Sequence, residues 1–189
     1  MLSAGPGDHA VAFYRENELA GLVGSYLQSA IRDGGSAVLV ATPDCRSQVN
    51  AWLTATGIDL AGAWADGSYV PLDASQTMDR FVINGRPDAA AFWETMSPVL
   101  AAAGRREGPV RVFGGMVAML WQTCSAEAAI ELEALWNEIG GQYPFALLCG
   151  YPVAATSDVA DSDVLAQVCC AHSSVVGAPS GSDVAWLPG

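Results

Sequence analysis

The chain has 189 residues, which is enough for one domain with a short tail. Its hydrophobic fraction of 51% predicts a folded core rather than global disorder. Twenty acidic residues stand against eight basic ones, all of them arginine, and give a formal charge of -12. The missing lysine excludes a standard Walker-A NTPase and Schiff-base chemistry on lysine. The acidic balance argues against nucleic acid or an anionic membrane as a partner.

The N-terminal residues 1–8 carry no positive charge and no apolar run, so they do not resemble a signal peptide. No apolar stretch approaches the roughly 20 residues of a membrane-spanning helix. We therefore expect a cytoplasmic protein.

Five cysteines occur without a CxxC pair, so the spacing predicts no structural zinc site and no other metal centre or cofactor. The adjacent Cys169 and Cys170 lie in an apolar segment. We expect them to be buried, reduced thiols.

The first half of the chain alternates apolar runs with amphipathic segments. Residues 16–33 have apolar side chains at helical spacing and end at Gly34-Gly35, as helices commonly do. Thr42 and Pro43 are typical of a helix start, and Pro71 favours an edge strand. The pattern predicts strands at 9–14, 37–41 and 68–73, and helices at 16–33, 42–56 and about 73–82.

The second half continues the alternation after a turn at residues 84–87. The segment 125–140 is strongly amphipathic, and its acidic residues, Glu133 among them, are expected to face solvent. The pattern predicts helices at 88–103, 116–121, 125–140 and 161–171, and strands at 110–113, 144–150 and 174–176.

Strands that alternate with helices predict an α/β three-layer sandwich with a mostly parallel sheet. We expect one domain over residues 9–176, a flexible N-terminus at 1–8 and a flexible tail at 177–189. In open sheets of this kind, ligands bind beyond the carboxyl ends of the strands. The turns that follow the predicted strands are therefore the places to look for a site.

The turn after the first strand carries Tyr14, Arg15, Glu16 and Glu18, where a nucleotide-binding protein would have a glycine-rich phosphate loop. Two carboxylates there suit a polyphosphate poorly. They have a simpler interpretation, because acidic side chains stabilise a helix N-terminus.

The two histidines, His9 and His172, are open to either a structural or a chemical interpretation. A lone histidine is more often structural, although it can titrate or bind a metal. A nucleophilic pair of His172 with Cys149 or Cys170 is conceivable, but nothing in the spacing requires it.

The turn Phe113-Gly114-Gly115-Met116 joins a predicted strand to a helix that ends near Trp121. Glycines there allow a backbone or a ligand to approach closely. Methionine and aromatic side chains beyond the turn either line a soft apolar pocket or fill the core.

Several motifs, taken in order, resemble the MEDS domain, a sensory domain of methanogen and methylotroph regulators such as the dichloromethane-responsive repressor. The version here is most similar to the one associated with actinobacterial histidine kinases and anti-sigma regulators. The resemblance covers about residues 8–176. The motifs are HAVAFY (9–14), AVLVATP (37–43), YVPLDASQT (69–77), NGRPD (84–88), VRVFGGMVAMLW (110–121), AIELEALWN (129–137), PFALLCGYP (144–152) and CAHS (170–173).

The resemblance implies a RecA/KaiC-like core with a degenerate phosphate loop, and a sensory role rather than catalysis. It also implies small hydrophobic ligands in some members. Relatives usually carry Gly-Glu-Met where this chain has Gly114-Gly115-Met116, so the acidic residue is missing here. No kinase or DNA-binding segment follows, which implies action through a separate partner such as a histidine kinase, an anti-sigma regulator or a transcription regulator.

The sequence thus predicts a non-catalytic sensory domain that binds a small, mostly apolar ligand or a signalling partner, and that forms a homodimer in one interpretation. The alternatives are a ligand-free interaction scaffold built on a dead NTPase fold, and an enzyme with residual nucleotide or thiol chemistry. The expected ligand-binding residues are His9, Phe13, Tyr14, Glu16, Glu18, Phe113, Gly114, Gly115, Met116, Trp121, Cys149 and Tyr151.

Overall fold

The computed structural model describes residues 5–123, 125–152 and 162–176. Its centre is a six-stranded sheet in the order β3-β2-β6-β7-β1-β8, in which every neighbouring pair is parallel. The strands are β1 (His9–Tyr14), β2 (Ser36–Ala41), β3 (Tyr69–Asp73), β6 (Val110–Gly114), β7 (Ala146–Pro152) and β8 (Ser174–Val176).

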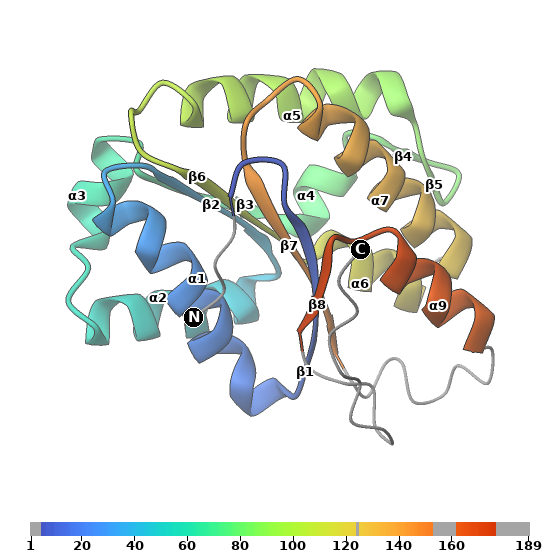
Figure 1. The fold of residues 1–189 in the computed structure, drawn as a ribbon, viewed down its shortest axis with the longest axis horizontal. Coiled ribbons are helices and arrows are strands. Elements are labelled where there is room, and N and C mark those ends of the chain that lie inside the picture. The colour runs from blue at the N-terminus through green and yellow to red at the C-terminus, as the bar shows by residue number, and fades with distance from the viewer. Residues whose placement is uncertain (1–4, 124, 153–161, 177–189) are drawn as a thin grey trace.

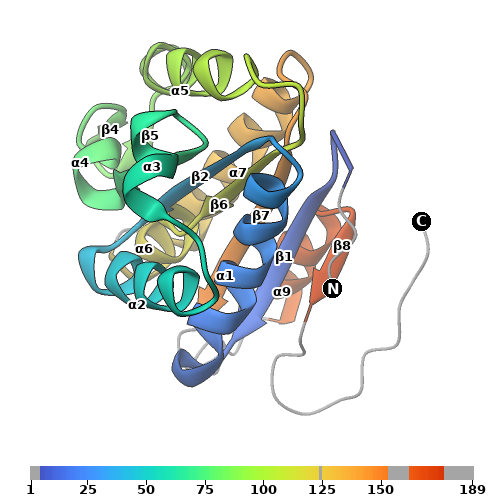
Figure 2. The ribbon, with the colours of Figure 1, turned by 90° about the vertical axis from the view of Figure 1, so that its left-hand side faces the viewer.

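Helices cover both faces of this sheet (Figures 1 and 2). One face carries α1 (Glu16–Arg32), α2 (Pro43–Ala55) and α3 (Leu60–Ala65). The other carries α4 (Ala74–Met78), α5 (Ala89–Ala103), α6 (Met116–Thr123), α7 (Ala126–Gly140) and α9 (Ser162–Cys170). The predicted α/β sandwich with a parallel sheet is confirmed.

Side chains of the strands divide between the two faces with the period of two that a strand imposes. On β1, Ala10 and Ala12 pack against the α1 side, and Val11 and Phe13 against the α7 side. The central strands are buried on both faces, which is why they appear in the sequence as continuous apolar runs.

The helix starts follow the capping residues seen in the sequence. The side chain of Thr42 accepts a hydrogen bond from Cys45 N at 3.3 Å, Asp88 from Ala91 N at 2.9 Å, and Ser125 from Ala128 N at 3.1 Å. These bonds satisfy amides that have no partner inside the helix. The predicted starts of α2, α5 and α7 are therefore confirmed.

The structure differs from the sequence-based expectation at two short elements. Helix α3 was not predicted, because it has only six residues; its cap is Asp59, which accepts from Gly62 N at 3.1 Å. The turn predicted at 84–87 is shorter, since Asn84 and Gly85 take the positive φ angles of 52° and 78°. Residues Arg86–Pro87 (β5) instead pair antiparallel with Val82–Ile83 (β4).

The C-terminal part of α9 corrects the expectation for its two cysteines. Cys170 is exposed and Cys169 is half-buried, while Val168 faces the core. Consecutive residues of a helix point in different directions, so an edge helix buries only one of them. Of the N-terminus predicted to be flexible at 1–8, residues 1–4 lie outside the described residues, as does the tail predicted at 177–189. Within the described ranges, no helix is long and apolar enough to cross a membrane.

Candidate functional site

A cavity of about 260 Å³ opens at the carboxyl edge of the sheet, where β1, β2 and β6 end. Apolar side chains such as Leu19, Phe113 and Met119 form part of its wall, and Asp44 and Gln122 add polar groups. The full lining is Tyr14, Leu19, Ala41, Thr42, Asp44, Cys45, Gln48, Phe113, Gly115, Ala118, Met119, Gln122 and Pro152.

Three of the residues expected to bind ligand, Tyr14, Phe113 and Gly115, line this cavity. Gly115 N donates a hydrogen bond to Val40 O at 2.9 Å and ties the turn after β6 to β2. A Cβ atom at position 115 would lie 3.1 Å from that same carbonyl oxygen. The turn therefore favours glycine, because the backbone of β2 approaches it closely, as the sequence suggested.

Other expected residues lie elsewhere. Phe13 and Met116 are buried in the core on the α7 side, and Gly114 is buried within β6. Trp121 is half-buried and packs edge-on against Tyr151, with ring centroids 5.6 Å apart. None of these four is part of the cavity lining.

In the turn after β1, a carboxylate from the start of α1 already binds a backbone amide. Glu16 is the first residue of α1. The exposed Glu18 accepts a hydrogen bond from Arg15 N at 3.1 Å through Oε2. A backbone amide that a phosphate loop would offer to a ligand is thus already satisfied by a carboxylate.

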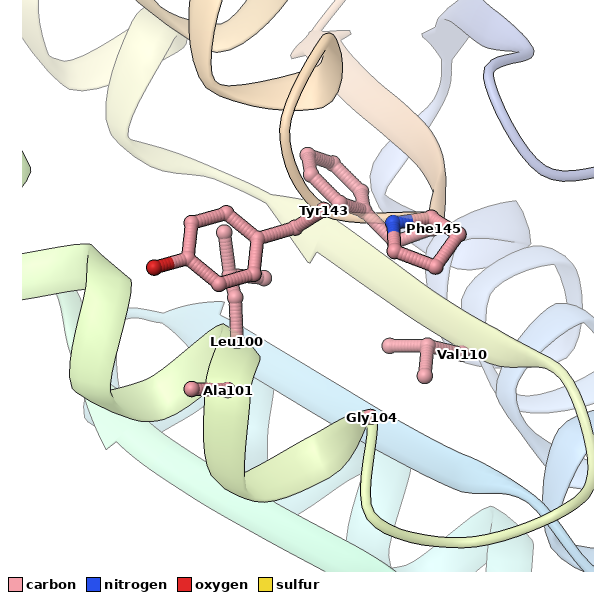
Figure 3. Close-up of a pocket in the computed structure, with 7 residues that line it drawn as sticks. Leu100, Ala101, Gly104, Val110, Tyr143 and Phe145 are labelled. Atoms are coloured by element: carbon pink, nitrogen blue, oxygen red, sulfur yellow. The ribbon is translucent and has the colours of Figure 1, made fainter.

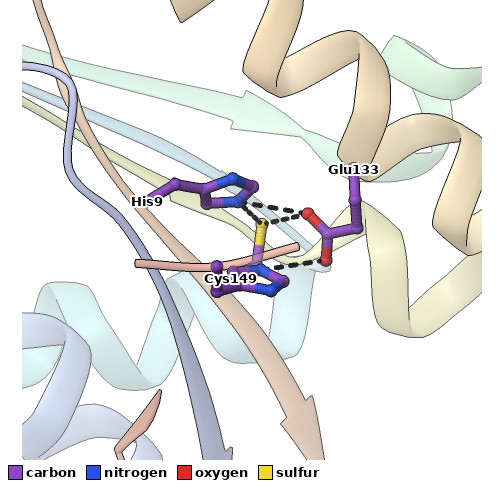
Figure 4. A group of neighbouring side chains, drawn as sticks. His9, Glu133 and Cys149 are labelled. Carbon is purple, nitrogen blue, oxygen red and sulfur yellow. Dashed lines mark hydrogen bonds and ion pairs between the residues drawn. The ribbon is translucent and has the colours of Figure 1, made fainter. Parts of the chain in front are cut away.

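A second group of polar side chains is buried between the sheet and the helices α7 and α9. It consists of His9, Glu133, Cys149 and His172, and we call it the His–Glu–Cys cluster (Figure 4). His9 and Cys149 come from the neighbouring strands β1 and β7, Glu133 from α7, and His172 from the segment after α9. One ligand atom from each residue lies within 4.8 Å of all the others.

Glu133 is the centre of the cluster. Its Oε2 accepts a hydrogen bond from Cys149 Sγ at 3.1 Å and lies 3.2 Å from His9 Nε2. Its Oε1 accepts from the hydroxyl of Tyr151 at 2.8 Å and lies 3.4 Å from His172 Nε2. His9 Nε2 is also 3.2 Å from Cys149 Sγ. The side chains of Glu133 and His172 are almost completely shielded from solvent.

The outer ring nitrogens of both histidines are held by neighbouring groups. His9 Nδ1 lies 2.8 Å from Asn137 Oδ1, and His172 Nδ1 lies 2.5 Å from Val168 O. The Asn137 amide is oriented by its own donor bond, from Nδ2 to Ala171 O at 3.2 Å. Both rings therefore present Nε2 to the cluster.

Burial and charge act in opposite directions on the ionisable groups here. Burial alone raises the pKa of Glu133, but the neighbouring His172 and His9 outweigh it and hold that pKa well below its usual range. Burial and the charge of Glu133 raise the pKa of Cys149 and of Tyr151 well above their usual values. The cluster thus favours a carboxylate, a neutral thiol and a neutral phenol.

Comparison with protein families gives one match over most of the chain. The family described as "MEthanogen/methylotroph, DcmR Sensory domain" matches residues 8–173. The chain belongs to the MEDS family. A search of the curated proteins found no match. The resemblance seen in the sequence motifs is thereby confirmed, and this MEDS domain is a member of a family of sensory domains.

The position of Glu133 in this MEDS domain corrects the sequence-based expectation that it faces solvent. Its side chain is fully buried. On a helix, residues three and four positions apart share a face, and position 133 lies between the buried Ala129 and Trp136. That spacing was the available signal. It was missed because a glutamate on an amphipathic helix normally marks the polar face.

A smaller cavity of about 180 Å³ lies at the opposite, amino edge of the sheet in this MEDS domain (Figure 3). Its walls are mainly apolar. They consist of Leu100, Ala101, Gly104, Val110, Tyr143, Pro144 and Phe145. None of the residues that the sequence suggested lies there, and ligand sites in parallel sheets form at the other edge.

Proposed function

We propose that this MEDS domain is a non-catalytic sensory module that binds a small, mostly apolar ligand at the carboxyl edge of its sheet. In this proposal it relays ligand occupancy to a separate protein, a histidine kinase, an anti-sigma factor or a transcription regulator. The observation that carries the proposal is the cavity of about 260 Å³ formed where β1, β2 and β6 end. Membership of a sensory family supports it.

The size and lining of the cavity limit the ligand class. A volume of about 260 Å³ is larger than the roughly 150 Å³ cavity that accepts benzene, and slightly below the range of drug-sized sites. Phe113, Leu19 and Met119 favour an apolar body. Asp44 and Gln122 offer polar atoms that would orient one polar group on the ligand.

The relay requires two arrangements of the protein with different affinity for the ligand. The cavity is walled by α2 and α6, which begin immediately after β2 and β6. A ligand between these helices stabilises whichever of their positions fits it better. The partner then recognises the favoured arrangement, and the free energy available for signalling equals the difference in ligand affinity between the two.

The proposal includes a RecA/KaiC-like core whose phosphate loop has degenerated. In its support, the β1–α1 turn carries no glycine cluster, and the Glu18 carboxylate accepts a hydrogen bond from the backbone amide of Arg15. The loop offers a carboxylate where a nucleotide would bring phosphate, and the two would repel each other. Gly115 stands where relatives usually have glutamate, so the ligand of this member is expected to differ from one that needs a carboxylate there.

The non-catalytic assignment rests on accessibility. The thiol of Cys149 has a histidine neighbour, as a thiol catalyst needs, but its side chain is fully buried and lines neither the carboxyl-edge cavity nor the amino-edge cavity. A substrate cannot approach it without local unfolding. We place the protein in the cytoplasm as part of the proposal, because free thiols such as Cys149 persist in a reducing compartment.

The proposal is tested with fluorobenzene as an apolar probe, followed by ligand-observed fluorine NMR. We expect the probe signal to broaden with the wild-type protein, and the broadening to disappear in Ala118→Phe, which fills the cavity. The matched control is Ala101→Phe, the same substitution in the wall of the amino-edge cavity. Thermal unfolding verifies that both variants fold.

Three outcomes contradict the proposal. No broadening with the wild-type protein would show that the cavity does not accept an apolar molecule. Equal broadening with wild type and with a folded Ala118→Phe variant would place the probe elsewhere. Loss of binding in Ala101→Phe alone would assign the ligand to the amino edge.

The second candidate function is a ligand-free interaction scaffold. The observation in its favour is Trp64 on α3, whose side chain is 71% exposed. Tryptophan is enriched where proteins contact one another. The scaffold is supported if a purified partner kinase binds the ligand-free domain at least ten-fold more tightly than it binds Trp64→Ser. Binding that requires the apolar probe supports the sensor.

A further inference from the structure

We infer that the His–Glu–Cys cluster is a binding site for one divalent transition-metal ion of the zinc class. The site shares no residue with the carboxyl-edge cavity. It therefore goes beyond the proposed function, and the two can fail independently.

The donor set is the first argument. Two imidazole nitrogens, one thiol sulfur and one carboxylate oxygen are the ligand types that zinc takes in proteins, usually four at a time. Magnesium and calcium need six or more oxygen ligands, which His9, Cys149 and His172 do not supply. The chemistry selects a borderline-soft ion such as Zn²⁺ or Co²⁺.

The spacing of the donor atoms is the second argument. Zinc bonds of about 2.0–2.3 Å in tetrahedral geometry place neighbouring ligand atoms about 3.3–3.7 Å apart. Glu133 Oε2, Cys149 Sγ and His9 Nε2 lie 3.1 to 3.2 Å from one another. His172 Nε2 lies 3.4 Å from the other oxygen, Oε1, and one atom from each of the four residues lies within 4.8 Å of the rest. The ion is accommodated when the first three side chains move slightly apart and His172 moves toward them.

The orientation of the two imidazole rings is the third argument. Val168 O can only accept, so His172 Nδ1 carries a hydrogen and donates it. Asn137 Nδ2 donates to Ala171 O, so Oδ1 of the same amide faces His9 Nδ1 and accepts from it. In the neutral rings that a metal binds, both Nε2 lone pairs point into the cluster, and the ion takes the place of the contacts between Nε2 and Glu133.

An unsatisfied atom supports the same conclusion. Within the part of the chain that the structure describes, His172 Nε2 is buried and makes no hydrogen bond of standard geometry, and its polar neighbour is Glu133 Oε1 at 3.4 Å. A buried polar atom without a partner costs free energy. A metal ion coordinated by this nitrogen satisfies it. In addition, metal-ligating histidines characteristically donate a hydrogen bond from their other ring nitrogen to a carbonyl oxygen, as Nδ1 of His172 and of His9 does here.

The charges balance when the ion binds. The thiol proton of Cys149 leaves to solvent, four coordinate bonds form, and one thiolate and one carboxylate neutralise the two positive charges of the ion. Tyr151 keeps its hydrogen bond to Glu133 and orients the carboxylate. With four protein ligands and no open position, the ion links β1, β7, α7 and the segment after α9 as a structural centre.

The experiment uses the full chain, stripped of metal and then titrated with Co²⁺ under reducing conditions. We expect one Co²⁺ per chain by native mass spectrometry, and a sulfur-to-cobalt charge-transfer band in the near-ultraviolet. Cys149→Ser should lose the band and bind Co²⁺ at least ten-fold more weakly. Cys170→Ser, which changes an exposed thiol at the end of α9, should retain both.

A measurement on the wild-type protein covers the case in which Cys149→Ser does not fold. X-ray absorption of the cobalt-loaded chain should show one sulfur and three nitrogen or oxygen neighbours. A wild-type chain that retains no ion, or a cobalt ion without a sulfur neighbour, overturns the inference. A charge-transfer band that survives in folded Cys149→Ser but disappears in Cys170→Ser overturns it as well. These readouts do not involve the fluorobenzene site.

Discussion

The carboxyl-edge cavity and the His–Glu–Cys cluster lie in the same domain but are built in opposite ways. The cavity is formed where β1, β2 and β6 end, by the turns after them and by the helices α1, α2 and α6, and its polar members Asp44 and Gln122 are exposed. The cluster is formed by side chains that reach inward from two strands, one helix and the segment after α9, and they are shielded from solvent. The exposed residues of the cavity wall can change without disturbing the core, whereas every side chain of the cluster is packed inside the fold.

This difference predicts different consequences of mutation. A substitution in the cavity changes what binds there and leaves most of the folding free energy intact. A substitution in the cluster removes a partner from buried polar groups, and the remaining groups then pay the cost of desolvation. The following measurements test that contrast, beginning with the largest effect.

Removal of the carboxylate in Glu133→Ala should have the largest effect. The substitution leaves Tyr151 OH, Cys149 Sγ and two imidazoles without their common acceptor. Loss of one partner of a buried ionic group costs about 3–5 kcal/mol of unfolding free energy. Urea denaturation measures this loss directly.

The matched control is Glu138→Ala on the same helix, because Glu138 is exposed. It should change the unfolding free energy by no more than about 0.5 kcal/mol. If the two substitutions lower the unfolding free energy equally, the cluster is not a buried network, and the contrast with the cavity disappears.

The fold could be predicted from the sequence because local signals agree along most of the chain. Continuous apolar runs such as 37–41 indicate strands covered on both faces, and Thr42, Asp88 and Ser125 mark helix starts that the structure confirms. Helix α3 and the β4–β5 hairpin were missed, because elements of two to six residues leave almost no periodicity.

The cavity lining could be predicted only in part. Tyr14, Phe113 and Gly115 were accessible to prediction because they follow the ends of strands. Thr42 also follows the end of a predicted strand, although it was not among the expected residues. The contribution of Cys45 and Gln48 depends on how α2 packs over the strand ends. Sequence spacing does not contain that information.

The cluster could not be assembled from the sequence. His9 was considered, and so was a pair of His172 with Cys149, but the meeting of His9 with Cys149 depends on the parallel pairing of β1 with β7. Glu133 was placed on the solvent side of α7, and His172 is brought in only by the return of the chain after α9. Long-range pairing, rather than any local pattern, creates this group.

Tyr151→Phe gives an effect of intermediate size. It removes the hydroxyl that donates to Glu133 Oε1 at 2.8 Å and retains the ring that packs against Trp121 and Phe13. A buried acceptor that loses its donor costs about 1–3 kcal/mol. The control is Tyr143→Phe at the amino-edge cavity, with an expected change of at most about 0.5 kcal/mol. Equal losses would show that Glu133 does not depend on this hydroxyl.

The smallest effect concerns the reactivity of thiols rather than stability. It is measured by comparing Cys45 in the cavity wall with Cys149 in the cluster. Burial, and secondly the charge of Asp44, raise the pKa of Cys45 in the cavity wall to about 11. Only the thiolate reacts, so alkylation of Cys45 by iodoacetamide should be slow near pH 8 and accelerate about ten-fold per pH unit up to about pH 10. Asp44→Asn should accelerate it at fixed pH, because the nearby negative charge is removed. Peptide mass spectrometry follows each site separately.

Cys149 provides the other half of this comparison. Its side chain is fully buried in the cluster, so it should remain unmodified over the same pH range unless the chain unfolds. A molecule bound in the cavity should slow the labelling of Cys45 and leave that of Cys149 unchanged, because Cys149 does not line the cavity. If Cys149 is alkylated in the folded protein as fast as Cys45, the cluster opens to solvent as readily as the cavity does. The two regions would then differ in composition but not in accessibility.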